Sequence, residues 1–208
     1  MIQSLSASLL SLLGWHLAPQ VPADTKIIII GAPHTSNWDF PMTLLALSAL
    51  GLRYSWIGKH TMFKEPFGSF FKKIGGIPVD RKARSGFIDE MVRTFAERDR
   101  LVLAIAPEGT RARKDHWKAG FYQIAVQAHV NICLGYIDYP TKTIGLGPVL
   151  VPTGDILGDF NVIKAFYQDK KGKYPHKAST ICLRDKEIAL LQQQHQKDQS
   201  APDKIDVE

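Results

Sequence analysis

The sequence feature that most limits the fold is a run of four isoleucines, Ile27–Ile30, that ends in Gly31. β-branched residues favour strands, and a continuous apolar run bounded by turn residues is typical of a strand buried on both faces. The chain then carries His34 and Asp39, separated by four residues, ahead of a second apolar segment. The sequence thus predicts two titratable side chains in a strand-to-helix turn, where α/β proteins commonly place functional groups.

His34 and Asp39 cannot share one face of a continuous helix, because five positions at 3.6 residues per turn rotate by roughly 140°. Pro33 disfavours a helix before His34, and Pro41 is tolerated only in a first turn, so we expect the helix to begin between Asn37 and Asp39. The helix dipole and free backbone donors would keep Asp39 ionised, and an ionised Asp beside an imidazole fixes its tautomer. The alternative is that Asp39 merely caps the helix and His34 is an ordinary turn histidine.

Strands and helices alternate along the rest of the chain. Strands are predicted at 53–57, 77–79, 101–105, 131–137 and 143–150, and helices at 38–50, 66–74, 85–98, 118–129 and 155–167. Gly145, Gly147 and Pro148 place the last of these strands near a sheet edge. This alternation predicts one α/β layered domain over residues 24–190, with a largely parallel central sheet flanked by helices.

Both ends of the chain differ from this domain. Residues 1–23 hold no Asp, Glu, Lys or Arg, and they predict an amphipathic helix that ends before Pro19. The residues on its apolar side are Ile2, Leu5, Leu9, Leu12, Leu13 and His16. The helix is too short and serine-rich for a membrane span, so it either lies in a membrane interface with Trp15 as anchor or packs on the domain. Residues 191–208 are polar and are predicted to form a disordered tail.

Positive charge gathers in the middle of the chain. The net charge is +6, and residues 53–118 hold 15 Lys and Arg side chains against 8 Asp and Glu, a local charge of +7. This indicates an anionic partner, whether phosphate, anionic lipid or nucleic acid, although a solvated basic surface is the alternative. Cys133 and Cys182 lie far apart without metal-ligand spacing, so we expect no disulfide framework, no metal site and a reducing, cytosolic environment.

Two more loops place functional groups at predicted strand ends. In Ala106-Pro107-Glu108-Gly109-Thr110-Arg111, Gly109 permits a tight turn, Thr110 offers a hydroxyl and Arg111 offers donors that match phosphate. Glu108 would hold Arg111 or accept from a substrate hydroxyl, and the alternative is a solvated loop with a Glu–Arg ion pair. The segment Gly75-Gly76-Ile77-Pro78-Val79-Asp80-Arg81 ends in a basic group, with a glycine turn before a basic helix start as its alternative.

The H-x-x-x-x-D turn, the G-G-I-P-V-D-R loop and the P-E-G-T-R loop follow one another on successive strand ends. In this order they resemble the first three signature blocks of the glycerolipid acyltransferases, the superfamily of 1-acylglycerol-3-phosphate acyltransferase. The resemblance covers roughly residues 26–136 and implies a glycerol-3-phosphate acyltransferase-like fold. It implies that His34 is the general base and Asp39 its orienting carboxylate. The residues it implies for binding the acceptor, chiefly its phosphate, are Arg81, Glu108, Gly109, Thr110 and Arg111, with Lys59 as a further candidate.

The fourth block is not reproduced, since Asn131-Ile132-Cys133-Leu134 stands where Val-Pro-Ile would be expected. The resemblance therefore leaves the acyl-donor and acceptor preference open. It implies transfer from a thioester of coenzyme A or acyl carrier protein to a lysophospholipid hydroxyl in phospholipid biosynthesis, without a metal or bound cofactor. The alternatives are another acceptor such as lyso-ornithine lipid, thioester hydrolysis, or a non-enzymatic basic module.

A partner and a location follow from the same features. The basic charge and the apolar N-terminal segment predict peripheral binding to an anionic membrane surface at its cytoplasmic face. Nucleic acid is not expected as a partner, because the basic stretch holds no recognisable nucleic-acid-binding motif and its aromatics, Phe67, Phe70 and Phe71, are typical of a packed helix face.

Overall fold

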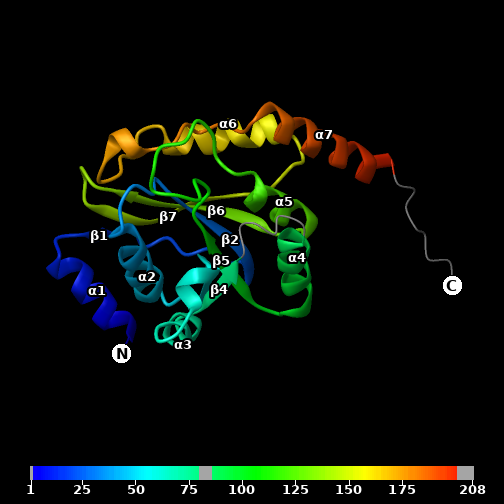
Figure 1. Ribbon diagram of the computed structural model, residues 1–208. Coiled ribbons are helices and arrows are strands. Elements are labelled where there is room, and N and C mark those ends of the chain that lie inside the picture. The colour runs from blue at the N-terminus through cyan, green and yellow to red at the C-terminus, as the bar shows by residue number, and fades with distance from the viewer. Residues whose placement is uncertain (1, 80–85, 201–208) are drawn as a thin grey trace.

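A seven-stranded sheet forms the centre of the computed structural model, which describes residues 2–79 and 86–200. Its strands are β1 (His16–Leu17), β2 (Lys26–Ala32), β3 (Tyr54–Lys59), β4 (Gly76–Val79), β5 (Leu101–Ile105), β6 (Asn131–Asp138) and β7 (Thr143–Leu150). Their order is β1-β7-β6-β2-β5-β3-β4. The five strands from β6 to β4 run parallel, whereas β7 is antiparallel to β6 and carries β1 parallel to itself. The predicted α/β domain with a largely parallel sheet is confirmed (Figure 1).

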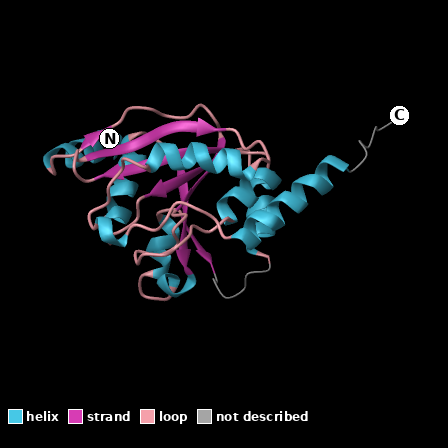
Figure 2. Ribbon diagram, turned by 90° about the horizontal axis from the view of Figure 1, so that it is seen from above, coloured by secondary structure: helices cyan, strands magenta, loops and turns pink. Residues whose placement is uncertain are grey.

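Helices cover both faces of this sheet (Figures 1 and 2). They are α1 (Ile2–Leu12), α2 (Asp39–Ala49), α3 (Gly68–Lys73), α4 (Phe87–Glu97), α5 (Gly120–Gln127), α6 (Ile156–Tyr167) and α7 (Asp185–Ser200), with 3-10 turns at His60–Phe63 and Pro175–Lys177. Side chains of α4, α5, α6 and α7 build the core on one face, and α2 packs on the other face with α1 beside it.

The isoleucine run occupies the middle of the sheet, because β2 pairs with β5 on one side and β6 on the other. Ile28 and Ile30 enter the core under α4 to α7, while Ile27 and Ile29 pack toward Leu47 of α2. All four are buried. Burying one such side chain stabilises a fold by about 1.5–3 kcal/mol, so this strand fixes where the sheet and the turn after it lie.

The strands and helices predicted between residues 38 and 167 all occur, with ends shifted by a few residues. The N-terminal helix is shorter than expected, since α1 ends at Leu12 and the chain then forms β1. Two residues are too few to give a strand pattern in the sequence. Because β1 pairs with it, β7, which was predicted near an edge, lies second from the edge of the sheet. β1 pairs with β7 only at Thr143 and Ile144.

The prediction of a disordered tail over 191–208 is wrong for residues 191–200, which belong to α7. This helix packs against α6, and it inserts Leu191 and the partly buried Ile188 into the main core. These two apolar side chains, about one helical turn apart, join the helix to the core, although the segment is polar on average. Residues 201–208 lie outside the described chain.

Helix α1 contacts the domain through one narrow side. Ser6 and Leu10 are buried there, and Leu10 packs with Met42 and Ala46 of α2. The apolar residues predicted to share a face are exposed instead, at 71% for Ile2, 70% for Leu5, 39% for Leu9, 83% for Leu12 and 49% for Leu13. The helix therefore packs on the domain and still presents an apolar face outward. Within residues 2–79 and 86–200, no helix has the length and apolar character needed to cross a membrane.

Candidate active site

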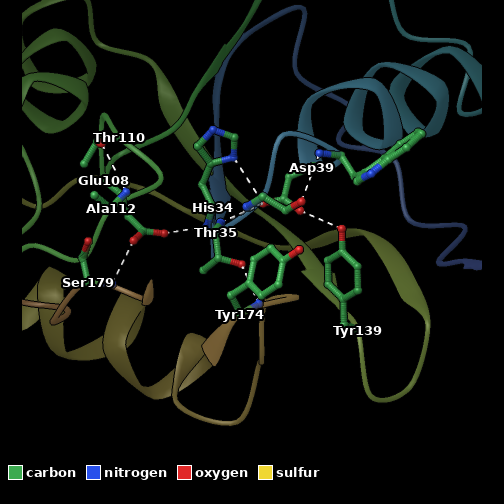
Figure 3. A network of polar contacts seen from close by, with 11 residues as sticks. His34, Thr35, Asp39, Glu108, Thr110, Ala112, Tyr139, Tyr174 and Ser179 are labelled. Carbon is green, nitrogen blue, oxygen red and sulfur yellow. Dashed lines mark hydrogen bonds and ion pairs between the residues drawn. The ribbon is translucent and has the colours of Figure 1, made fainter. Parts of the chain in front are cut away.

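Three of the predicted site residues, His34, Asp39 and Glu108, lie together at the carboxyl ends of the neighbouring strands β5, β2 and β6. Ala32 at the end of β2 is level with Tyr136 near the end of β6. His34 therefore follows β2 at the edge where Tyr139 follows β6 and Glu108 follows β5, and Figure 3 shows the three residues around one turn. Parallel sheets place ligands at this edge because their loops converge there.

The chain from His34 to Asp39, which we call the histidine turn, folds back so that the two side chains meet. His34 Nδ1 lies 3.5 Å from Asp39 Oδ2. The same carboxylate oxygen accepts from the backbone N–H groups of Thr35 and Ser36, each at 2.7 Å. The helix N-cap is Trp38, without a side-chain capping bond. Asp39 thus does not cap α2, so that part of the alternative is wrong. The predicted role of His34 stays a prediction.

The charge state of Asp39 follows from its surroundings. Burial raises the pKa of this carboxyl, but hydrogen bonds with His34, Ser36 and Tyr139 and the nearby imidazole lower it, and the net pKa lies below its ordinary value. The group is therefore ionised at neutral pH. An ionised carboxylate facing Nδ1 favours the proton on that nitrogen, which leaves the lone pair on Nε2 available to accept a proton.

Tyr139 belongs to the site although the sequence pattern did not reveal it. Its hydroxyl donates to Asp39 Oδ1 at 2.8 Å, and burial together with that carboxylate raises the tyrosine pKa, so it remains a neutral donor. The Trp15 ring packs edge-on against its ring at 5.0 Å between centroids. Tyr139 lies 100 residues from Asp39 along the chain. Its one sequence signal is its place two residues after the strand predicted at 131–137.

Glu108 is 2% exposed and lies against the histidine turn. Its Oε1 accepts from the His34 backbone N–H at 2.5 Å, and its Oε2 accepts from the Ser179 N–H at 2.9 Å. The carboxylate thus ties the ends of β2 and β5 to the segment after α6. The alternative of a solvated Glu–Arg ion pair is wrong for Glu108, because the side chain is buried and both oxygens hold backbone donors. Its predicted contact with the acceptor stays a prediction.

The other predicted binding residues lie at the same edge of the sheet or outside the described chain. Gly109 has φ +64°, a backbone conformation that favours glycine, and Thr110 Oγ1 accepts from the Ala112 N–H at 3.2 Å. Arg111 is exposed on this loop, and Lys59 is exposed at the end of β3. Arg81 lies outside the described residues. The predicted phosphate contacts of these side chains stay predictions.

The segment after α6, residues 170–179, crosses the histidine turn, and we call it the strap. Its Tyr174 N–H donates to Thr35 Oγ1 at 3.2 Å, and its Lys171 carbonyl accepts from the Tyr139 N–H at 2.9 Å. Gly172 lies so close to Thr35 that any Cβ there would collide with the threonine side chain. The strap is therefore fixed to the loops that follow β2, β5 and β6. No pattern in the sequence marks the strap.

Two other side chains that could act as nucleophiles, Ser36 and Cys133, are less suited to react with a substrate. Ser36 is buried and its Oγ accepts from the Trp38 N–H at 3.2 Å. Burial raises the pKa of Cys133 to about 12, so this thiol is un-ionised. Among residues 2–79 and 86–200, no three His, Cys, Asp or Glu side chains come together in a way that could hold a metal ion. Of the groups that the structure describes at this edge, the His34–Asp39 pair is the best suited to move a proton.

Known proteins share both the sequence pattern and the fold. A family model described as Acyltransferase matches residues 15–143, more than half of the 208 residues. The crystal structure of the 1-acyl-sn-glycerophosphate (LPA) acyltransferase PlsC from Thermotoga maritima is similar, with a TM-score of 0.58, 16% identity, and coverage of 81% of this chain and 77% of that one. No curated protein sequence matches the chain. At 16% identity the structural similarity supports the fold alone. The family model, which matches more than half of the chain, also indicates which family the chain belongs to.

Proposed function

Because the chain belongs to the Acyltransferase family, we propose that it moves a fatty acyl group from a thioester of coenzyme A or acyl carrier protein to the hydroxyl of a lysophospholipid. The proposed acceptor is 1-acylglycerol-3-phosphate, which would make phosphatidic acid the product. The observation that carries the proposal is the contact of His34 Nδ1 with Asp39 Oδ2 at 3.5 Å, at the carboxyl edge of a parallel sheet. The alternative of a non-enzymatic basic module is not retained, because the family is enzymatic.

The proposed mechanism uses His34 as a general base through Nε2. The acceptor oxygen attacks the thioester carbonyl carbon while Nε2 takes the hydroxyl proton, and Asp39 stabilises the resulting imidazolium. Breaking the C–S bond then forms the acyl ester, and the proton passes from the imidazolium to the leaving sulfur. The exposed fraction of the His34 side chain is 21%, which leaves the imidazole within reach of a substrate.

The function is tested with purified protein, labelled acyl thioester and a panel of acceptors. We expect an acyl ester with 1-acylglycerol-3-phosphate and one equivalent of free thiol for each ester formed. An ester formed only with lyso-ornithine lipid or another lysolipid would replace the acceptor. Free fatty acid without any ester would identify a thioesterase and contradict the proposed transfer.

Arg111→Ala is expected to raise the KM of the acceptor about 10- to 100-fold and to change kcat less. The reason is that a hydrogen bond to a charged group contributes about 1.5–3 kcal/mol, and each 1.4 kcal/mol is a factor of ten. Arg98→Ala removes an exposed arginine elsewhere and serves as the matched control. An unchanged acceptor KM in Arg111→Ala would assign the phosphate to other cations, such as Lys59 or Arg81.

We further propose that the protein works at the cytoplasmic face of a membrane. The support is the outward apolar face of α1, where Ile2, Leu5 and Leu12 are at least 70% exposed, together with the net charge of +6. Burying one such side chain contributes about 1.5–3 kcal/mol, and a basic residue near an anionic surface adds about 1 kcal/mol. This combination is typical of peripheral binding to anionic lipid.

We therefore expect the protein to co-sediment with anionic vesicles at low salt and to be released in part at high salt. Leu5→Ser with Leu12→Ser should weaken this binding, because both side chains would enter the lipid. Leu157→Ser, on the exposed surface of α6, is the matched control. Protein that stays in the supernatant with anionic vesicles at low salt would overturn the membrane proposal.

A further inference from the structure

The strap carries more positive charge than the proposed mechanism uses. Lys171, Lys173 and Lys177 are all exposed, whereas Lys170 pairs with Asp169 at 2.8 Å. In the described part of the chain, none of those three ammonium groups lies within ion-pair distance of a carboxylate. Unpaired cations beside a catalytic turn favour a ligand that carries several negative charges.

Exposed aromatic rings lie between these cations. Lys173 Nζ is 5.9 Å from the ring centroids of both Trp38 and Tyr174, and Lys177 Nζ is 4.6 Å from that of Tyr174. Trp38 is 62% exposed and Tyr174 is 39% exposed, so their rings remain accessible. Large flat rings interleaved with cations are suited to a planar base joined to phosphate groups.

The surface formed by Trp38, Lys173, Tyr174 and Lys177, which we call the strap platform, has a fixed place beside His34. Trp38 belongs to the histidine turn itself, and the Tyr174 N–H is bonded to Thr35, which is 1% exposed. Figure 3 shows Tyr174 and the loop with Glu108 and Thr110 on different sides of His34. The strap meets the Glu108 loop through the Ser179 N–H, whereas the Tyr174 backbone is bonded to Thr35 and Lys173 lies over the Trp38 ring. A second substrate can therefore use these rings while the Glu108 loop holds the acceptor phosphate.

We propose that the strap platform binds the phosphorylated nucleotide of coenzyme A, so that the acyl donor is acyl-coenzyme A. This inference rests on the proposed function, which requires a thioester donor. Coenzyme A ends in an adenine base with a 3′-phosphate and a 5′-diphosphate, which matches two exposed rings with lysines beside them. The 1-acylglycerol-3-phosphate acceptor has one phosphate and no base. An acidic carrier protein would pair with the lysines but would not need exposed rings.

Binding is tested without catalysis by titrating adenosine 3′,5′-bisphosphate and following tryptophan fluorescence. Trp56 is 4% exposed and Trp117 is 1% exposed, and the partly buried Trp15 packs on Tyr139 and is not part of the platform, so we expect Trp38 to give most of the change. We expect saturable quenching that Trp38→Phe removes, and a Kd at least tenfold higher in Lys173→Gln/Lys177→Gln. Lys164→Gln, an exposed lysine of α6, should bind as the wild type does. Absence of saturable binding to the wild type, or equal Kd values in the wild type and the double variant, would overturn the inference.

Steady-state kinetics then assign the site to one substrate. In Lys173→Gln/Lys177→Gln the KM for acyl-coenzyme A should rise at least tenfold more than the KM for acyl-pantetheine, which lacks the nucleotide. A rise in the acceptor KM instead would place the lysolipid on the strap platform, and a rise confined to acyl carrier protein as donor would make it a protein-docking surface. Either result overturns the inference. Nucleotide binding without acyl transfer would contradict the proposed function, whereas acyl transfer without nucleotide binding would contradict the inference alone.

Discussion

His34→Ala is expected to lower kcat for acyl transfer by about 10²–10⁴-fold, the range that general-base catalysis contributes. The variant should stay folded, because Glu108 is bonded to the backbone N–H of His34 and not to its side chain. The KM values should change little, since the imidazole removes a proton and need not hold either substrate in the ground state. The measurement is kcat at saturating donor and acceptor, together with a thermal melt.

His16→Ala is the matched control, because His16 is an exposed histidine on the edge strand β1. It should leave kcat unchanged. Turnover near the wild-type rate in folded His34→Ala would remove the general-base assignment, even if the acyl transfer itself were established.

Asp39→Asn is expected to lower kcat by about 10²–10⁴-fold, with a smaller effect on substrate affinity. Its carboxylate oxygens face the N–H groups of Thr35 and Ser36, the imidazole Nδ1 of His34 and the hydroxyl of Tyr139. An asparagine can keep its amide oxygen toward the Thr35 and Ser36 N–H groups and donate through its NH₂ group to the Tyr139 hydroxyl, but it carries no charge. His34 then loses the charge that fixes its tautomer. The measurement is kcat and KM for both substrates, with Asp99→Asn, an exposed Asp, as control.

The same variant tests the charge of Asp39 through stability. The pKa of Asp39 is lowered in the folded protein, so its ionised form stabilises the fold above the unfolded-state pKa. That contribution is lost as the pH falls through the lowered, folded-state pKa. The difference in unfolding free energy between wild type and Asp39→Asn should therefore be constant near neutral pH and shrink below about pH 3.9. A difference that grows on acidification would contradict the ionised state. Wild-type kcat in Asp39→Asn would contradict its role as orienting carboxylate.

Much of the fold and part of the site could be predicted because they depend on local patterns. The β-branched run of 27–30 favours a buried strand, and Gly, Pro and polar residues mark the ends of β2 and β5. These ends carry His34, Asp39 and Glu108, and parallel strands bring such ends together. The partners of Glu108 could not be predicted, since a sequence shows a carboxylate but not the backbone N–H groups that it will hold.

The strap and Tyr139 could not be predicted, because their contacts depend on the tertiary fold. Tyr174 and Ser179 reach the site through backbone N–H groups, which every residue except proline possesses, so no residue type marks the contact. Tyr139 contributes a side chain, but it follows β6 and lies 100 residues beyond Asp39 in the chain. Such contacts depend on the order of the strands in the sheet, which no single segment of the sequence determines.

Trp15, three residues beyond α1, packs against Tyr139, whose hydroxyl donates to the Asp39 carboxylate. A shortened protein that begins after this tryptophan would lose the outward leucines of α1 and the support of Tyr139 in one step. If such a deletion variant were inactive, the loss could come either from poor adsorption to lipid or from a displaced Asp39. Replacing the outward leucines of α1 one at a time leaves the tryptophan in place and separates adsorption from turnover.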